Sequence, residues 1–169
     1  MAWRFDPDHS QVEWASRYLG ISTIKGSFDR VTADVYVEDA DPSKWSIAAE
    51  IDAGSVSSAG FVRRLEAMPS DRFLDAQRFP KITFRSTRIQ RQDGELVIDG
   101  DLTLHGVTKP ASLRGRENGE AVDGRGNRRR GFSGHMRISR TAFEIPPPET
   151  TFVPDEVDIS FEIQLLWGE

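Results

Sequence analysis

The chain has 169 residues, with 22 Lys and Arg against 27 Asp and Glu, which gives a formal net charge of -5 at pH 7. This length fits one core-forming domain, predicted over residues 1–169, and leaves no room for a second. The negative charge disfavours nucleic acid as a partner. Because the sequence has no Cys, it offers no disulfide framework, thiolate metal site or cysteine nucleophile.

The first residues predict where the chain resides. Met1 to Asp6 lack the basic and apolar regions of a secretory signal peptide, which predicts a cytoplasmic location as written. A periplasmic or secreted location follows only if a leader is missing. No apolar run approaches the ~20 residues that a membrane-spanning helix needs. Membrane contact is therefore expected to be peripheral at most.

Alternation of apolar and polar residues is the main signal along the chain. In the first such segment Val12, Trp14, Ser16 and Tyr18 share one face of an extended strand. The same period recurs in five later segments, whose inward residues are Ala33, Val35 and Val37; Ile82 and Phe84; Leu96, Ile98, Leu102 and Leu104; Phe132, Met136 and Ile138; and Val157, Ile159, Phe161, Ile163 and Leu165. These patterns predict half-buried strands.

Turn-forming residues separate the strand segments. Asp93-Gly94 predicts a tight hairpin, and further turns are predicted at Asp41-Pro42-Ser43, His105-Gly106, Glu117-Asn118-Gly119 and Gly124 to Asn127. Connections this short favour antiparallel neighbours.

One segment breaks the alternation. The spacing of Phe61, Leu65 and Met68 predicts a short helix that ends at Pro69, and Phe73-Leu74 predicts a further helical turn. The prediction is one or two short helices inserted between strands.

About eight antiparallel strands with one apolar face each predict an all-β fold, either as two packed sheets or as a closed barrel. The barrel is favoured because closure removes exposed strand edges and little else in the sequence could cover a wide sheet. The interior of such a barrel is filled by its own side chains or holds one small ligand.

Several local strings resemble the YceI-like proteins. The most specific run from Leu102 to Pro110 (LTLHGVTKP) and from Phe79 to Ser86 (FPKITFRS), and shorter matches lie at Asp6 to Ser10 and Arg140 to Phe143. The resemblance runs in order over essentially the whole chain. It implies an extended, lipocalin-like antiparallel barrel with a long apolar lumen, which binds polyisoprenoid chains such as isoprenoid quinones.

Two departures from the family pattern affect the expected mouth of the barrel. Members resemble Arg-Asp-x-His-Leu in the helical insertion, whereas this chain has Arg63-Arg64-Leu65-Glu66. Glu144 stands where the family usually shows glycine. The barrel is expected to survive these changes, and the identity of the ligand is left open.

The histidines predict neither a metal site nor a hydrolase. His9, His105 and His135 lack the close spacing of zinc ligands. Asp6, His9 and Ser10 could be drawn as a hydrolytic triad, but a turn explains Asp and Ser at these positions equally well. No catalytic residue, metal or cofactor is therefore predicted.

Arginines form the one basic cluster, at Arg125, Arg128, Arg129 and Arg130. Guanidinium groups could hold an anionic headgroup or approach anionic lipid. A solvated hairpin tip is the favoured interpretation.

Inward-facing apolar residues carry the functional prediction. The candidate ligand-binding residues are Val12, Trp14, Tyr18, Val35, Val37, Phe61, Leu65, Phe73, Leu74, Phe84, Leu102, Leu104, Phe132, Met136, Phe143, Ile159, Phe161 and Ile163. These side chains either fill the barrel or line an open lumen, and the family resemblance favours the lumen. Phe61, Leu65, Phe73 and Leu74 are candidates to close one end of it.

The predicted function is to bind and carry or store a polyisoprenoid, an isoprenoid quinone or another long-chain lipid, without catalysis. A homodimer is a possible assembly. The alternative is an enzyme that cyclises or isomerises an apolar substrate, for which Glu13, Tyr18, His135 and Glu144 are the candidate acids and bases. A third alternative is a scaffold whose own aromatic side chains fill the barrel.

Overall fold

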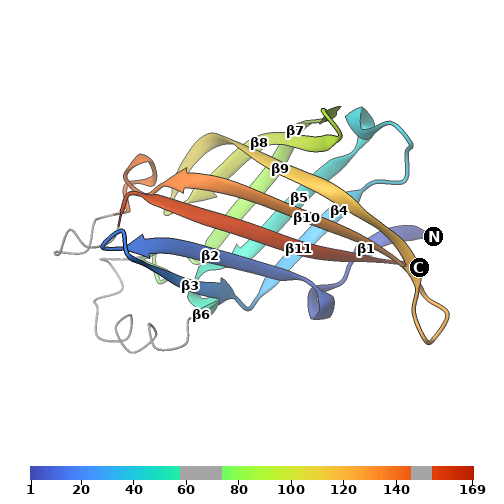
Figure 1. Cartoon of the computed structure of the whole chain (residues 1–169), viewed down its shortest axis with the longest axis horizontal. Helices are drawn as coiled ribbons and strands as arrows, with labels where there is room; N and C mark the ends of the chain where they lie inside the picture. Colours follow the sequence, from blue (N-terminus) through green and yellow to red (C-terminus); the bar gives the residue numbers. More distant parts are fainter. Residues whose placement is uncertain (58–73, 146–153) are drawn as a thin grey trace.

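The computed structural model describes residues 1–57, 74–145 and 154–169, and these residues form one 11-stranded sheet. Its strands are β1 (Ala2–Phe5), β2 (Gln11–Tyr18), β3 (Ser22–Phe28), β4 (Val31–Tyr36), β5 (Ser46–Asp52), β6 (Val56–Ser57), β7 (Lys81–Gln92), β8 (Glu95–Leu104), β9 (Val107–Val122), β10 (Arg128–Ser139) and β11 (Glu156–Gly168). Figure 1 shows the long strands running beside one another along the length of the molecule.

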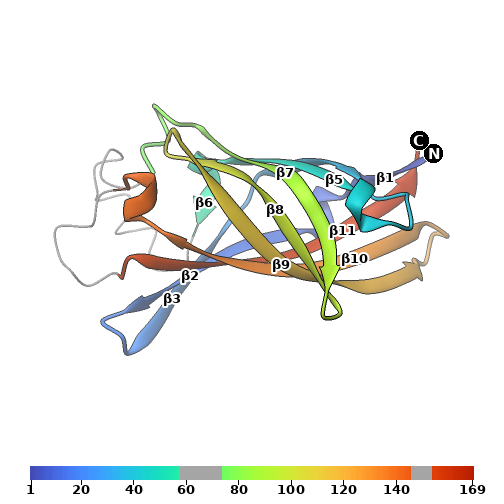
Figure 2. The same ribbon diagram turned by 90° about the horizontal axis from the view of Figure 1, so that it is seen from above.

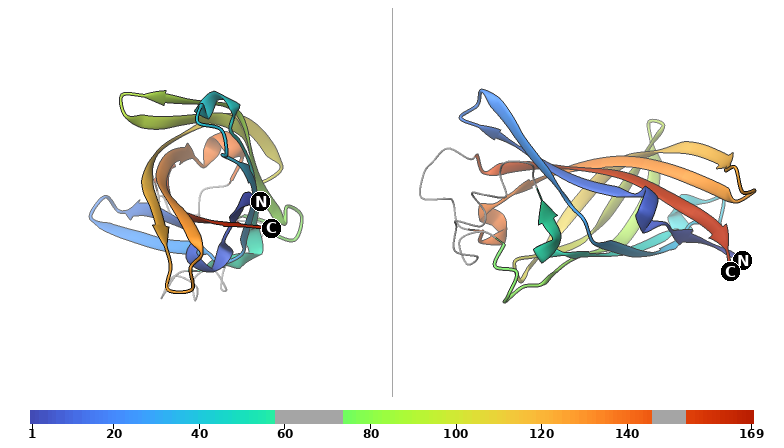
Figure 3. Two further views of the ribbon diagram at one scale, coloured as in Figure 1. Left: turned by 90° about the vertical axis from the view of Figure 1, so that its right-hand side faces the viewer. Right: turned by 90° about the horizontal axis from the view of Figure 1, so that it is seen from below.

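Every strand pair is antiparallel, and the order across the sheet is β4-β5-β7-β8-β9-β10-β11-β2-β3-β6, with β1 on the end of β11. Viewed along the molecule, the sheet curls around its own interior (Figure 3). The expected all-β, antiparallel, lipocalin-like fold is thus confirmed, as a curled half-barrel.

The chain itself brings the two ends of the sheet together. β3 and β4 lie near opposite ends of the strand order, yet only Asp29 and Arg30 separate them in sequence. This corner is held by Ser55, whose backbone oxygen accepts from the Asp29 amide at 3.1 Å and whose hydroxyl accepts from the Arg30 amide at 3.1 Å. The sheet therefore encloses its apolar face without a separate covering element among the described residues.

The other side of the enclosure is formed by β1 against β4. Here the backbone amide of Trp3 donates to the carboxylate of Glu38 at 2.9 Å. Figure 2 shows β1 and the two chain termini together at one end of the half-barrel.

Four of the five predicted turns are confirmed, among them the one at Asp41 and the one at Gly124 to Asn127 between β9 and β10. Asp93 and Gly94 have φ values of 52° and 81°, and His105 and Gly106 have φ values of 54° and 72°, so each pair forms a left-handed two-residue turn between strands. The predicted turn at Glu117 to Gly119 is wrong, because these residues lie inside β9. There Glu117 pairs with Phe132 and Gly119 with Gly131, so that Asn118 is the extra residue of a β-bulge.

The sheet has more strands than the predicted eight because several carry little alternation. β1 and β6 are short, and β3 exposes or half-buries every residue, so these strands produce no clear period-two signal. The predicted helix from Phe61 to Met68 lies outside the described residues.

Within those residues the helical elements are short 3-10 turns: η1 (Pro7–His9), η2 (Pro42–Lys44), η3 (Ala53–Ser55) and η5 (Thr141–Phe143). Asp6, Asp41 and Asp52 cap the first three, since each side chain accepts from a backbone amide two residues further on. No helix in the described part of the chain is long and apolar enough to cross a membrane.

Strands β7 and β8 approach each other closely at Gly100. This residue pairs with Ser86 beside a register shift in β7. A Cβ atom at Gly100 would lie 2.5 Å from Cζ of Phe84 and 2.5 Å from the backbone oxygen of Arg85. The missing side chain therefore lets the Phe84 ring lie close against β8.

Gly100→Ala is expected to lower the free energy of unfolding by about 1–3 kcal/mol, because backbone and an aromatic ring must move apart. Urea unfolding of the purified variant measures this. Gly124→Ala is the matched control, since a Cβ atom at Gly124 would have no described atom within 4 Å, and it should stay within about 0.5 kcal/mol of wild type. Equal midpoints for both variants would contradict the close approach.

Candidate functional site: an apolar cavity

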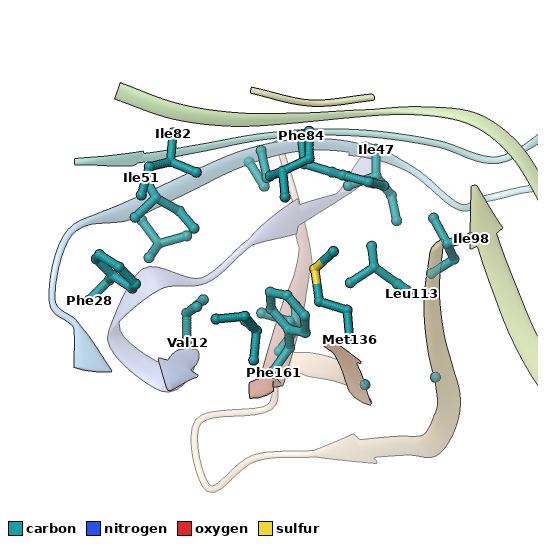
Figure 4. Close-up of a pocket in the computed structure, with 18 of the residues that line it drawn as sticks. Val12, Phe28, Ile47, Ile51, Ile82, Phe84, Ile98, Leu113, Met136 and Phe161 are labelled. Carbon is teal, nitrogen blue, oxygen red and sulfur yellow. The ribbon is translucent and has the colours of Figure 1, made fainter. Parts of the chain in front are cut away.

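The curled sheet encloses a cavity of about 270 Å³. Its wall is built from the inward faces of the strands, with Val12, Phe84, Met136 and Phe161 projecting toward one another across it (Figure 4). The predicted binding residues that the structure places on this wall are Val12, Trp14, Val35, Val37, Leu74, Phe84, Leu102, Leu104, Phe132, Met136, Ile159, Phe161 and Ile163. The interior is thus not filled by its own aromatic side chains.

Two predicted residues lie elsewhere. Tyr18 is half-buried but off the wall, because β2 pairs with β11 only from Gln11 to Ala15 and then continues with β3 into a projecting hairpin. Phe143 is buried in η5, where strand alternation no longer decides which way a side chain points. Phe61, Leu65 and Phe73 lie outside the described residues.

Several wall residues were missed by sequence reasoning. They come mainly from strands without a recognised pattern, and include Phe5, Ile24, Phe28, Val31, Trp45, Ile47, Ala49, Ile51, Val56, Ile89, Leu113 and Ile145. A signal was available in β5, where Ile47, Ala49 and Ile51 alternate with polar or small residues. Phe28 and Val56 pair beside the corner at Asp29, and the sequence has no local signal for a corner of this kind.

The cavity wall is long in one direction. Along β11, every second residue from Val157 to Leu165 lines it. Eight residue rises of ~3.3 Å make this row about 26 Å long. A row of that length accommodates an extended chain better than a compact ring system.

Aromatic side chains pack the end of the half-barrel that carries the termini. Trp3 and Trp45 are buried there, with the Trp3 and Trp167 ring centroids 5.2 Å apart and those of Trp45 and Phe132 6.2 Å apart. The guanidinium of Arg130 lies 5.0 Å from the Trp45 ring centroid and 5.2 Å from that of Phe132. These contacts form the aromatic end of the cavity.

Polar atoms at the aromatic end have partners within the protein. The Trp45 indole nitrogen donates to the Asp39 backbone oxygen at 2.6 Å. Arg130 donates to the Val37 backbone oxygen at 2.9 Å and to the Glu117 carboxylate at 3.0 Å. At this end the polar groups of Trp45 and Arg130 are therefore hydrogen-bonded within the protein, and aromatic rings face the cavity.

Acidic side chains form ion pairs with the arginine cluster. Arg129 donates to Asp6 at 2.6 Å and to Asp123 at 2.8 Å, and Arg128 donates to Glu120 at 3.0 Å. Burial acts to raise the pKa of Asp6, but hydrogen bonds from Arg129 and His9 outweigh it and hold that pKa below its usual value. Because these charges are already matched, the cluster is disfavoured as an anionic headgroup site.

The candidate acids and bases for catalysis do not reach the cavity. Glu13, His135 and Glu144 are exposed, and Tyr18 is off the wall. Among the described wall residues none is Asp, Glu, His, Lys or Tyr. Over the same described ranges, no group of three His, Asp or Glu side chains could hold a metal ion.

The expected turn at the N-terminus is confirmed. The Asp6 carboxylate lies 2.8 Å from Nδ1 of His9, and the Ser10 hydroxyl donates to the Asp6 backbone oxygen at 2.7 Å rather than to the imidazole. The geometry is that of a capped turn.

A long apolar cavity within a curled antiparallel sheet defines the class of lipocalin-like binding proteins. A sequence model of the YceI-like domain matches residues 3–165. The chain therefore belongs to the YceI-like family, as its sequence motifs indicate.

Relatives support the family assignment, and solved structures share the fold. A UPF0312 protein of Pseudomonas putida strain W619 is 34% identical over 156 residues, covering 91% of this chain and 80% of the relative, and one from Vibrio campbellii is 33% identical over 139 residues, covering 82% and 73%. The structure resembles Burkholderia cenocepacia BcnA with a TM-score of 0.80 at 24% identity, covering 95% of this chain and 98% of BcnA. It also resembles a polyisoprenoid-binding domain from Saccharophagus degradans with a TM-score of 0.67 at 12% identity, covering 98% of both chains.

Acid is expected to weaken the Arg129 network. Asp6 and Asp123 both have pKa values lowered in the folded state, Asp123 through hydrogen bonds from Asn127 and Arg129. Their stabilising contribution is present above the unfolded pKa of about 3.9 and is lost as pH falls from there through the lowered folded-state values. Arg129→Gln should therefore lower the urea midpoint at pH 6 and make its decline toward pH 3 shallower than in wild type.

Arg137→Gln is the control for this measurement. Arg137 donates to Asp158 at 2.8 Å, but both side chains are exposed to solvent, where an ion pair contributes only about 0–1 kcal/mol. Parallel pH profiles for wild type and Arg129→Gln would contradict the role assigned to Arg129.

Proposed function

We propose that this protein binds a long apolar molecule, of the polyisoprenoid or isoprenoid-quinone kind, in the cavity and carries or stores it without catalysis. The observation that carries the proposal is the wall of apolar side chains, about 26 Å long, which encloses open space. The likeness to the Saccharophagus degradans polyisoprenoid-binding domain supports it at the level of the fold.

Desolvation supplies the driving force for binding. Each buried methylene contributes about 0.8 kcal/mol. A tail of about 20 such groups gains ~16 kcal/mol before the cost of association, which is ~4–15 kcal/mol. The length of the tail rather than polar recognition then sets the affinity.

The composition of the wall supports a non-catalytic role. Cyclisation or isomerisation of an apolar substrate needs a positioned acid or base. The described part of the wall supplies none among Asp, Glu, His, Lys and Tyr. Holding a molecule away from water is the activity that these side chains fit best.

The first experiment is native mass spectrometry of the freshly purified protein, before and after incubation with a short-chain ubiquinone. One bound lipid per chain, or saturable uptake of the quinone, is the expected result. Trp14 and Trp45 line the cavity, so quenching of tryptophan fluorescence by the quinone gives the affinity. A protein that neither carries nor takes up an apolar molecule would overturn the proposal.

Ala49→Phe tests whether the cavity is the binding site. Ala49 lies on the wall, paired with Ala33 and with Phe84 on the neighbouring strands. A phenyl ring at this position would occupy the middle of the cavity, so quinone affinity should fall at least about 10-fold, which corresponds to ~1.4 kcal/mol.

Ala48→Phe is the matched control. Ala48 is the preceding residue of β5, and successive side chains of a strand point to opposite faces. Its ring would lie outside the cavity, and quinone affinity should stay close to that of wild type. Equal losses in both variants would place the quinone elsewhere on the protein.

A further inference from the structure

Ser16 is a polar exception within the apolar wall. The residue is 8% exposed, it lines the cavity, and its hydroxyl has no hydrogen-bond partner among the described residues. A buried hydroxyl without a partner is costly, so native proteins rarely leave one in place. The contents of the cavity are the natural source of an atom that completes this hydrogen bond.

Strand register places Ser16 toward the end opposite the aromatic end. Trp14 pairs with Ile159, and Ile159 pairs with Met136, so these side chains form one row across three strands. Ser16 lies two residues beyond Trp14, toward the tip of β2, which Figure 1 shows at the end away from the termini. Ile138 occupies the corresponding position on β10.

A buried cation lies near the same end. Arg140 follows β10 directly, lines the cavity and is 7% exposed. Two strand spacings of ~4.8 Å separate β2 from β10, and Arg140 comes two residues after Ile138, just past the end of β10, so Ser16 and Arg140 lie toward the same end of the cavity. Both residues line one cavity, which brings their side chains toward the same region.

Arg140 also has polar contacts within the protein. Its Nε donates to the Pro154 backbone oxygen at 3.1 Å, and its backbone amide donates to the Asp155 backbone oxygen at 2.9 Å. Burial lowers the pKa of Arg140, and the nearby Asp155 carboxylate acts to raise it.

We propose that Ser16 hydrogen-bonds the oxygen-bearing head of the bound lipid, with the tail directed toward Trp45. The inference rests on the proposed function and specifies its ligand class: a long apolar chain with a hydrogen-bonding oxygen atom at one end. Because Trp45 and Arg130 already have partners within the protein, the aromatic end is suited to hydrocarbon.

Phytanol and phytane test this proposal, because they are an isoprenoid alcohol and a hydrocarbon that differ only in one hydroxyl. Competition of each compound against a fluorescent lipid gives its affinity for wild type and Ser16→Ala. Loss of one neutral hydrogen bond should weaken phytanol binding about 3- to 10-fold and leave phytane binding unchanged. The ligand-free Ser16→Ala protein should be at least as stable as wild type, since the variant removes an unsatisfied buried hydroxyl.

Ser160→Ala is the matched control, because Ser160 lies exposed on the outer face of β11. It should change neither affinity. Equal weakening of both compounds by Ser16→Ala, no weakening of phytanol, or a destabilised ligand-free variant would overturn the role of Ser16 and leave the proposed function standing. Failure of wild type to bind either compound would overturn both.

Discussion

The architecture depends on one antiparallel sheet that curls around its own apolar face. No second layer covers that face in the described part of the chain, so burial of its side chains requires the sheet to meet itself. The corner at Asp29 and Arg30, the contact of β1 with β4 and the bulges in β7 and β9 produce this curvature. Because a long sheet curled in this way cannot bring all its side chains into contact, a cavity follows from the same geometry that buries the core.

The two ends of the cavity differ in how their polar atoms are satisfied. At the aromatic end, Trp45 and Arg130 have partners within the protein. Toward the other end, the Ser16 hydroxyl has none within the described ranges, and the buried Arg140 lies nearby. Because the two ends differ, a molecule with a polar head and an apolar tail fits the cavity in one orientation.

Binding and stability make opposite demands at such a position. An unsatisfied hydroxyl lowers the stability of the empty protein, while a ligand that completes the hydrogen bond restores it. Glu144 also adopts a strained conformation, with φ of 56°, in the left-handed region that glycine would occupy more easily. Its backbone amide closes the turn by donating to the Thr141 backbone oxygen at 3.1 Å.

The sequence by itself determined the strand alternation, the hairpin turns at Asp93 and His105 and the family, because these signals are local in the chain. It also placed Val12, Trp14 and Phe161 on the inward face, since a period of two needs no tertiary information. Tertiary structure decided that Tyr18 leaves the wall, that Ile47 and Leu113 join it and that Arg129 is neutralised by Asp6. It alone showed that Ser16 lacks a partner among the described residues, because hydrogen bonding depends on which distant residues the curled sheet brings within reach.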